Sequence, residues 1–173
     1  MAACYRAFLE PDMMERLIVW GEVRSDNVLT GLNVSNDIYY ILTANVDASN
    51  GYTKWEPVYR VINYCNTVLE KAPAVQQSDP NFKAGELRAY QAEAITLRAL
   101  CYFYLVRTFK DVPFTTLSYK DDTRPFQLAQ TDGDDIIDEL LGELESISDN
   151  YAKAVYSNTG DTKGRITQKA MWR

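Results

Sequence analysis

The chain contains no histidine, although it has 18 basic and 24 acidic side chains among its 173 residues. Histidine is the side chain that most often moves protons in enzymes, and it is also the commonest metal ligand. Without it, neither a Ser-His-Asp nor a Cys-His arrangement can be built, and a histidine-containing zinc site is excluded. We therefore expect a protein that is not an enzyme and that carries no metal or other cofactor.

The carboxylates remain as candidates for chemistry, because a glycosidase needs only two of them, about 5–10 Å apart in one cleft. The most conspicuous acids lie in predicted turns, in a first helical turn and on an outer helix face: Asp121, Asp122, Asp134, Asp135, Glu143 and Glu145. We interpret these acids as solvated. The stretch from Asp47 to Glu56 comes close to a calcium loop, but Gly51 and the acidic positions fall out of the EF-hand register. The sequence thus disfavours both a glycosidase and a calcium site.

Residues 24–55 combine aromatic side chains with Asn, Asp and Arg, which is the mixture that a sugar site requires. Aromatic rings contact the apolar face of a sugar, and the polar side chains bond its hydroxyl groups. The segment is largely irregular and exceeds about 12–15 residues, a length beyond which connections are usually functional or disordered. Its Asn and Tyr content favours function. The predicted ligand contacts are Arg24, Asp26, Asn27, Tyr39, Tyr40 and Trp55.

Each of these candidates also has a structural interpretation. Arg24 could pair with Asp26 and brace the loop instead of touching a ligand. Tyr39 and Tyr40 are adjacent, so at most one of them faces the core, and the outward one is the candidate stacking platform. Trp55 begins an apolar stripe at helical spacing, which is typical of packing.

Composition narrows the choice of partners. The formal net charge is -6 and the basic residues are scattered, so no basic stripe is present for a nucleic acid backbone. No stretch reaches the roughly 18 apolar residues that span a bilayer. Cys4, Cys65 and Cys101 are odd in number and far apart. We expect them to be small buried core residues and not a disulfide framework.

Apolar residues at three- and four-residue steps predict helices along most of the chain. The first helical segment, residues 2–16, is interrupted at Pro11, and residues 22–53 form a loop with one short helix inside it. The next helix, residues 55–72, has about 17 residues, with Pro73 just past its end. Further helices are predicted at residues 84–109, from Gly133 to near Asn150, and from residue 165 onward with Thr167 as a cap.

The predicted helix over residues 84–109 carries two apolar stripes, so we expect it to contact neighbours on two sides. Such a helix is typical of stacked helical hairpins, since one hairpin cannot bury its apolar face alone. Asn63 and Asn66 are expected to make buried hydrogen bonds that fix a helix against a loop. The sequence therefore predicts an all-α fold with a long loop insertion before residues 55–72. The short last helix predicts a chain that is part of a larger α domain.

Three motifs lie on the two long predicted helices and just after them. They are Trp55-x-x-Val58-Tyr59-x-x-Ile62-x-x-Cys65-Asn66-x-Val68-Leu69, Glu93-Ala94-x-x-Leu97-Arg98-Ala99-Leu100-x-Tyr102-Phe103-x-Leu105-Val106, and Phe109-x-Asp111-Val112-Pro113. Together they resemble the SusD/RagB family of nutrient-binding outer-membrane lipoproteins of Bacteroidetes. Two further stretches, Trp20 to Asn27 and Gly164 to Thr167, resemble other family segments, so the resemblance spans nearly the whole chain.

The resemblance implies that residues 1–173 form a single SusD-like N-terminal domain of irregular tetratricopeptide-like hairpins, truncated at its C-terminus. It also implies a surface-facing position on the outer membrane, through a lipid anchor absent from this chain. The expected partners are a SusC-like TonB-dependent transporter and a glycan or peptide ligand, without catalysis. The alternative is a helical-repeat protein interaction module with no small-molecule ligand. A fully buried set of aromatic side chains in residues 27–55 would favour that alternative.

Overall fold

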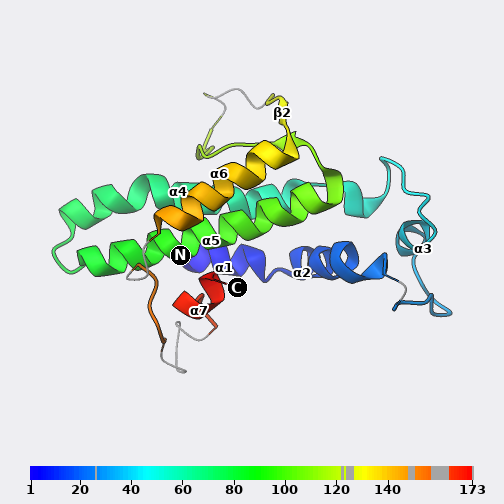
Figure 1. The fold of residues 1–173 in the computed structure, drawn as a ribbon, viewed down its shortest axis with the longest axis horizontal. Coiled ribbons are helices and arrows are strands. Elements are labelled where there is room, and N and C mark those ends of the chain that lie inside the picture. Colours follow the sequence, from blue (N-terminus) through cyan, green and yellow to red (C-terminus); the bar gives the residue numbers. More distant parts are fainter. Residues whose placement is uncertain (26, 122, 124–126, 148–150, 157–163, 173) are drawn as a thin grey trace.

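The computed structural model of the protein describes residues 1–25, 27–121, 123, 127–147, 151–156 and 164–172. Helices make up nearly all the regular structure of these ranges, so the all-α prediction is confirmed (Figure 1). The one departure within them is a two-residue antiparallel ribbon, in which β1 (Val112–Pro113) pairs with β2 (Gln130–Thr131). Helical periodicity carries no information about so short a ribbon.

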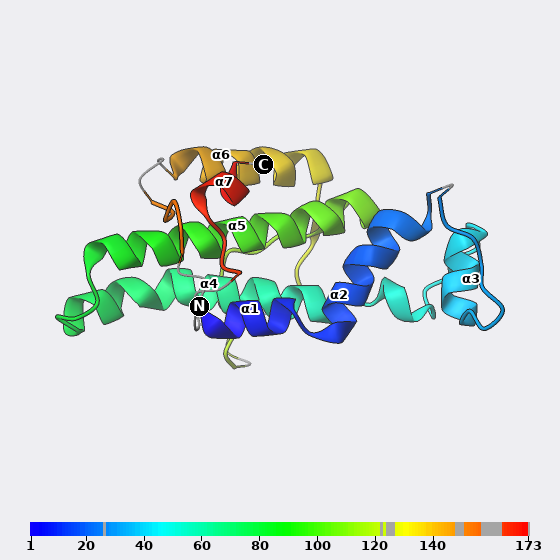
Figure 2. The same ribbon diagram turned by 90° about the horizontal axis from the view of Figure 1, so that it is seen from below.

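The centre of the molecule is an antiparallel hairpin of two long helices, α4 (Glu56–Ser78) and α5 (Ala84–Phe109). The short helix α1 (Ala2–Phe8) packs against α4, and α6 (Gly133–Ser146) packs against α5. Figure 2 shows α5 lying between α4 and α6. The predicted bounds of α5 and its contacts on two sides are both confirmed.

The helix α4 extends beyond its predicted end. It contains Pro73 and runs on to Ser78, so the prediction that it stops before Pro73 is wrong. A proline inside a helix removes one backbone hydrogen bond. Here α4 stays beside the first turns of α5 up to the connecting turn, and this pairing supports the helix after the proline (Figure 1).

The N-terminal segment is helical with a break at Pro11, as predicted. The helix α2 (Pro11–Ile18) has its proline at the first position, where the missing N–H costs nothing. It continues directly into a π-helical turn, η1 (Val19–Val23), in which Val19, Trp20 and Val23 are buried. The following irregular segment holds α3 (Asn36–Leu42), capped by the Ser35 side chain, and the short 3-10 turn η2 (Gly51–Thr53).

The remaining helices begin at polar caps. The Asp132 side chain accepts a hydrogen bond from the Asp134 N–H (2.9 Å) at the start of α6. This helix ends at Ser146, short of the predicted Asn150, a residue that lies outside the described ranges. The Thr167 side chain caps α7 (Gln168–Met171), as predicted.

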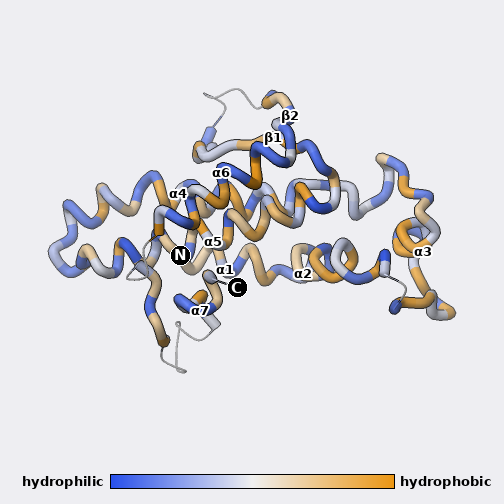
Figure 3. The backbone as a smooth tube through the Cα atoms, in the orientation of Figure 1, coloured by the Kyte–Doolittle hydropathy of each residue, from blue (hydrophilic) through white to orange (hydrophobic). Residues whose placement is uncertain are grey.

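Apolar residues gather where α1, α4, α5 and α6 meet, whereas the turn between α4 and α5 is mainly hydrophilic (Figure 3). Cys4, Cys65 and Cys101 are buried and free within this core, which confirms their prediction as small core residues. Burial raises the pKa of the Cys101 thiol well above its ordinary value. Among the described residues, no helix is both long and apolar enough to cross a membrane.

Candidate functional site

A groove of about 610 Å³ lies where η1, α3, the segment before η2 and the end of α5 come together. We call it the loop groove, because most of its lining comes from the predicted segment 24–55 and its flanks. Its volume is within the range of about 300–1,000 Å³ that is typical of small-ligand sites. The lining side chains with polar or aromatic character include Trp20, Arg24, Asp47, Tyr52, Arg107 and Phe109.

The loop groove has a rigid aromatic edge. The Trp20 ring meets the Phe109 ring edge to face, with centroids 5.3 Å apart. The Trp20 indole N–H donates to the Tyr52 carbonyl (3.1 Å), which ties the segment before α4 to η1. The Tyr52 hydroxyl donates to Glu15 (2.5 Å). Burial, and after it this bond to Glu15, raises the pKa of Tyr52 to about 12, so the hydroxyl stays a donor at neutral pH.

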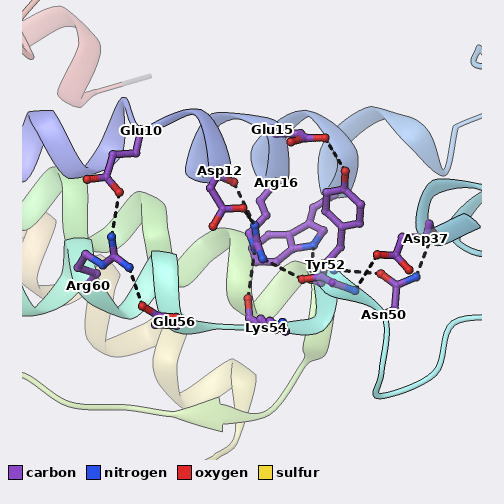
Figure 4. A network of polar contacts seen from close by, with 12 residues as sticks. Glu10, Asp12, Glu15, Arg16, Asp37, Asn50, Tyr52, Lys54, Glu56 and Arg60 are labelled. Atoms are coloured by element: carbon purple, nitrogen blue, oxygen red, sulfur yellow. Dashed lines mark hydrogen bonds and ion pairs between the residues drawn. The ribbon is translucent and has the colours of Figure 1, made fainter. Parts of the chain in front are cut away.

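Arg16 braces the backbone on either side of Tyr52 and Thr53, which line one wall of the loop groove, and Figure 4 shows its contacts. Its guanidinium donates to the carbonyl oxygens of Gly51 (2.8 Å) and Lys54 (3.3 Å), and it pairs with Asp12 one turn earlier on α2. The residue is only 5% exposed. A buried guanidinium with its donors satisfied fixes the backbone it touches, because leaving those donors unpaired would be costly.

The same wall is joined to α3. The Asn50 side chain donates to the Asp37 carbonyl (3.0 Å), and the Gly51 N–H donates to the Asp37 carboxylate (3.1 Å) (Figure 4). A Cβ atom at Gly51 would lie 2.9 Å from that carboxylate oxygen, so this close approach suits glycine. The residues that come close to a calcium loop in sequence therefore serve as a brace, and the described residues hold no cluster that could bind a metal ion.

The predicted ligand contacts do not all lie in the loop groove. Arg24 lines it and is exposed. Asn27 is exposed on the following loop and does not line the groove, and Asp26 lies outside the described residues. Tyr39 and Tyr40 lie on α3, 47% and 40% exposed, with ring centroids 6.0 Å apart. Neither tyrosine faces the core, so both are available on the helix that contributes Ile41 to the groove.

Trp55 lies elsewhere. Its ring packs against Phe109 and Tyr59, with centroids 5.6 Å and 6.2 Å away, in agreement with the packing interpretation. It also lines a second groove, of about 660 Å³, between α4 and the connection that follows β1. We call this the connection groove; Tyr59, Asn63 and Tyr119 line it as well.

The connection groove has a wall that is fixed by side chains from the two long helices. The Tyr59 hydroxyl donates to the Pro113 carbonyl (2.5 Å), and the Tyr102 hydroxyl donates to the Thr115 carbonyl (3.1 Å). The Thr115 N–H in turn donates back to the Tyr102 hydroxyl (2.9 Å). A short non-helical segment is thereby attached to both α4 and α5.

Asn63 and Asn66 complete this attachment. Asn63 bonds both backbone groups of Tyr119, accepting from its N–H (2.7 Å) and donating to its carbonyl (2.9 Å). Asn66 donates to the carbonyls of Thr115 (3.2 Å) and Leu117 (3.0 Å). The prediction that these two asparagines fix a helix against a loop is confirmed.

Arg98 extends the network across the bundle. Its guanidinium donates to the Asn66 side chain (2.6 Å) and pairs with Glu143 of α6 (2.5 Å). Arg98 is buried, and the Glu143 side chain is 20% exposed. The interpretation of Glu143 as a solvated acid is therefore wrong, because α5 brings a buried guanidinium to it. The exposed Asp134, Asp135 and Glu145 fit that interpretation.

Glu93 is a buried carboxylate that holds several segments together, a role that the sequence analysis did not predict. It binds Arg165 through two hydrogen bonds and accepts one each from the hydroxyls of Tyr5 and Tyr156 (both 2.5 Å). Burial, together with the bond to Glu93, raises the pKa of both tyrosines well above its ordinary value. The sequence did contain a signal for this role: Glu93 lies between Ala92 and Ala94 on an apolar helix, and a charge buried there needs a partner of opposite charge.

The fold and its two braced grooves define a class of helical-hairpin scaffold whose surface grooves are large enough for a small ligand. Residues 8–171 match the SusD-like family described as starch-binding associating with outer membrane, and the chain belongs to this family. The family membership that the sequence motifs predicted is thereby confirmed.

Individual relatives agree with this assignment. SusD-like protein P2 of Formosa agariphila is 23% identical over 99 residues, which are 57% of this chain and 18% of that protein. The surface glycan-binding protein A of Bacteroides uniformis superposes with a TM-score of 0.80 at 22% identity, over 98% of this chain and 38% of that chain. A laminarin-binding SusD-like protein gives 0.77 at 22% identity, over 98% and 37%. The chain thus spans well under half of these relatives' length.

Proposed function

We propose that the protein binds glycans at the cell surface, with the loop groove and the adjoining α3 as the contact region. Family membership supports a glycan ligand, and the exposed Tyr39 and Tyr40 support the location. Two exposed aromatic rings on a short helix are typical of a surface on which sugar rings stack. Arg24, at the rim of the groove, supplies donors for hydroxyl groups.

The exposed tyrosines also favour this function over a protein interaction module. That alternative expects the aromatic side chains of residues 27–55 to be buried. Tyr39 and Tyr40 are exposed, and Tyr52 is half-buried at the edge of the groove. The exposure of the two tyrosines is the observation that carries the proposal.

We further propose that the intact protein delivers its glycan to a SusC-like TonB-dependent transporter, held at the outer membrane by a lipid anchor. The family description, which associates its members with the outer membrane, supports this role. Co-purification of the intact protein with the transporter from solubilised outer membranes is the expected result. Its absence under conditions that keep the transporter intact would contradict the partnership.

The binding proposal is tested by calorimetric titration of the intact protein with a panel of oligosaccharides. We expect Tyr39→Ala combined with Tyr40→Ala to weaken the best ligand about tenfold or more, because each stacked ring contributes on the order of 1 kcal/mol. Tyr64→Ala, which removes an exposed tyrosine from α4, is the matched control and should leave the affinity unchanged. Equal affinities for all three proteins would exclude α3 as the contact region.

A further inference from the structure

Two arginines from distant parts of the chain line the loop groove. Arg24 follows η1, and Arg107 lies in the last turn of α5. Both side chains are exposed, so neither is a core residue. Arg107 was not among the residues expected from sequence, because an arginine near a helix C-terminus is an ordinary dipole-compensating residue. Only the fold brings it to the same groove as Arg24.

Neither arginine is neutralised within the part of the chain that the structure describes. Arg107 donates to the Gly21 carbonyl (3.3 Å), which orients the guanidinium but leaves its charge uncompensated. By contrast, the buried Arg16 and Arg98 and the partly buried Arg165 each pair with a carboxylate. No carboxylate of the described residues pairs with either groove arginine, so both guanidinium groups can meet an anionic ligand in the loop groove.

Asp47 is the acidic side chain that lines the same groove. Its Oδ1 atom accepts hydrogen bonds from the Ser49 N–H (2.7 Å) and the Ser49 hydroxyl (2.6 Å). These bonds lower the pKa of Asp47. Its carboxylate is therefore an anion whose hydrogen bonds stabilise the turn that contains Asp47 and Ser49. Two cationic side chains and one anion therefore line the groove, in a chain whose overall charge is -6.

We propose that the loop groove selects anionic saccharides, with Arg24 and Arg107 binding the carboxylate or sulfate groups of the sugar units. This inference rests on the proposed glycan-binding function and names the class of glycan. The planar guanidinium presents paired donors that match the oxygens of a carboxylate or a sulfate. The aromatic edge at Trp20 and Phe109 then borders the apolar part of the same ligand.

The test is calorimetric titration of the intact protein with three oligosaccharides of equal length: an oligogalacturonide, a sulfated galactan fragment and a neutral β-glucan fragment. We expect one of the two anionic ligands to bind at least about tenfold more tightly than the neutral one. Its affinity should fall as NaCl is raised from low to high concentration, because exposed charges are screened. Comparing the two anionic ligands tells carboxylate from sulfate recognition.

Two variants connect the selectivity to the residues. Arg24→Gln and Arg107→Gln should each weaken the anionic ligand about tenfold and the neutral ligand much less, because glutamine keeps hydrogen-bond donors for hydroxyl groups and loses only the charge. Arg6→Gln removes the same charge from an exposed position of α1 outside the groove and should change neither. All three variants should keep the parental melting temperature.

The outcomes separate the two proposals. Tighter or equal binding of the neutral glucan, without salt dependence, would overturn the anionic selectivity and leave the glycan-binding function standing. An equal loss of affinity for the anionic and the neutral ligand in Arg107→Gln would also overturn the anionic selectivity, because the arginine would then support the shape of the groove and not recognise a charge. Failure to bind any saccharide would overturn both.

Discussion

Glu93 and Arg165 form a two-point ion pair although they lie 72 positions apart in the sequence. Arg165 donates from Nε to one carboxylate oxygen (2.9 Å) and from Nη2 to the other (2.6 Å). Tyr5 also reaches this carboxylate, and its hydroxyl accepts the Ile166 N–H (2.9 Å). One side chain of α5 therefore joins α1 to the segment that leads into α7.

Replacing Glu93 with glutamine should lower the free energy of unfolding by about 3 kcal/mol or more. The substitution keeps the shape of the side chain but leaves the partly buried Arg165 guanidinium without its counter-charge. Urea unfolding followed by circular dichroism measures the loss. The control is Glu139→Gln on the exposed face of α6, which should change stability little. Similar free energies of unfolding for the two variants would show that the Glu93–Arg165 pair contributes little to stability.

Asn66→Ala should lower the free energy of unfolding by at least about 2 kcal/mol. It removes the donor to the Leu117 carbonyl, one of the two donors to the Thr115 carbonyl, and the acceptor of the buried Arg98 guanidinium. Each buried polar group left unpaired costs about 1–3 kcal/mol. Asn81→Ala, at an exposed turn, is the matched control. Hydrogen exchange should also rise over residues 113–119. Unchanged exchange there would mean that other contacts hold the segment in place.

Arg16→Met should loosen the wall of the loop groove while largely preserving the side-chain volume. Without the guanidinium, the carbonyls of Gly51 and Lys54 lose their buried donors. We expect faster amide exchange over residues 50–54 and a loss of about 2 kcal/mol in stability. Arg6→Met, at an exposed position of α1, should alter neither. Local exchange that matches the parent would contradict the bracing role.

Glu70 should make stability depend on pH in the acidic range. Bonds from Lys71 and then Ser118 lower its pKa from the ordinary 4.5 to about 2. The ionised carboxylate is thus favoured in the folded state. Its contribution is fully present above about pH 5 and shrinks as the pH falls toward 2, because the unfolded chain takes up the proton first.

The measurement compares melting temperatures of the parent and of Glu70→Gln at pH 7 and at pH 3. The advantage of the parent at pH 7 should be smaller at pH 3. Glu145→Gln, which removes an exposed acid from α6, should show no such narrowing. A constant difference between parent and Glu70→Gln would contradict the assignment.

Local patterns in the sequence predicted most of the fold. The bounds of α5, the break at Pro11 and the Thr167 cap depend on apolar spacing and on residues within one turn. The extension of α4 past Pro73 and the β1–β2 ribbon depend on contacts between distant segments. No local pattern reports these contacts.

The candidate site also has parts that local sequence predicted and parts that depend on contacts between distant segments. The segment 24–55 was expected to hold it, and Arg24 does line the loop groove. Arg107 comes from the end of α5 and Asp47 from a turn, so their meeting depends on how α3 and η1 pack. Glu93 and Arg98 belong to a motif that identified the family, but their partners Arg165 and Glu143 could be found only in three dimensions.

The anchoring of the non-helical segments has a consequence for how such proteins diversify. Arg16, Asn63, Asn66 and Tyr102 bond to carbonyl and N–H groups of the main chain, and every residue type except proline has both groups. Side chains along the anchored segments can therefore change through evolution without dislodging the backbone that presents them. A lineage can therefore alter the exposed surface of these segments by mutation while it inherits the same supports unchanged.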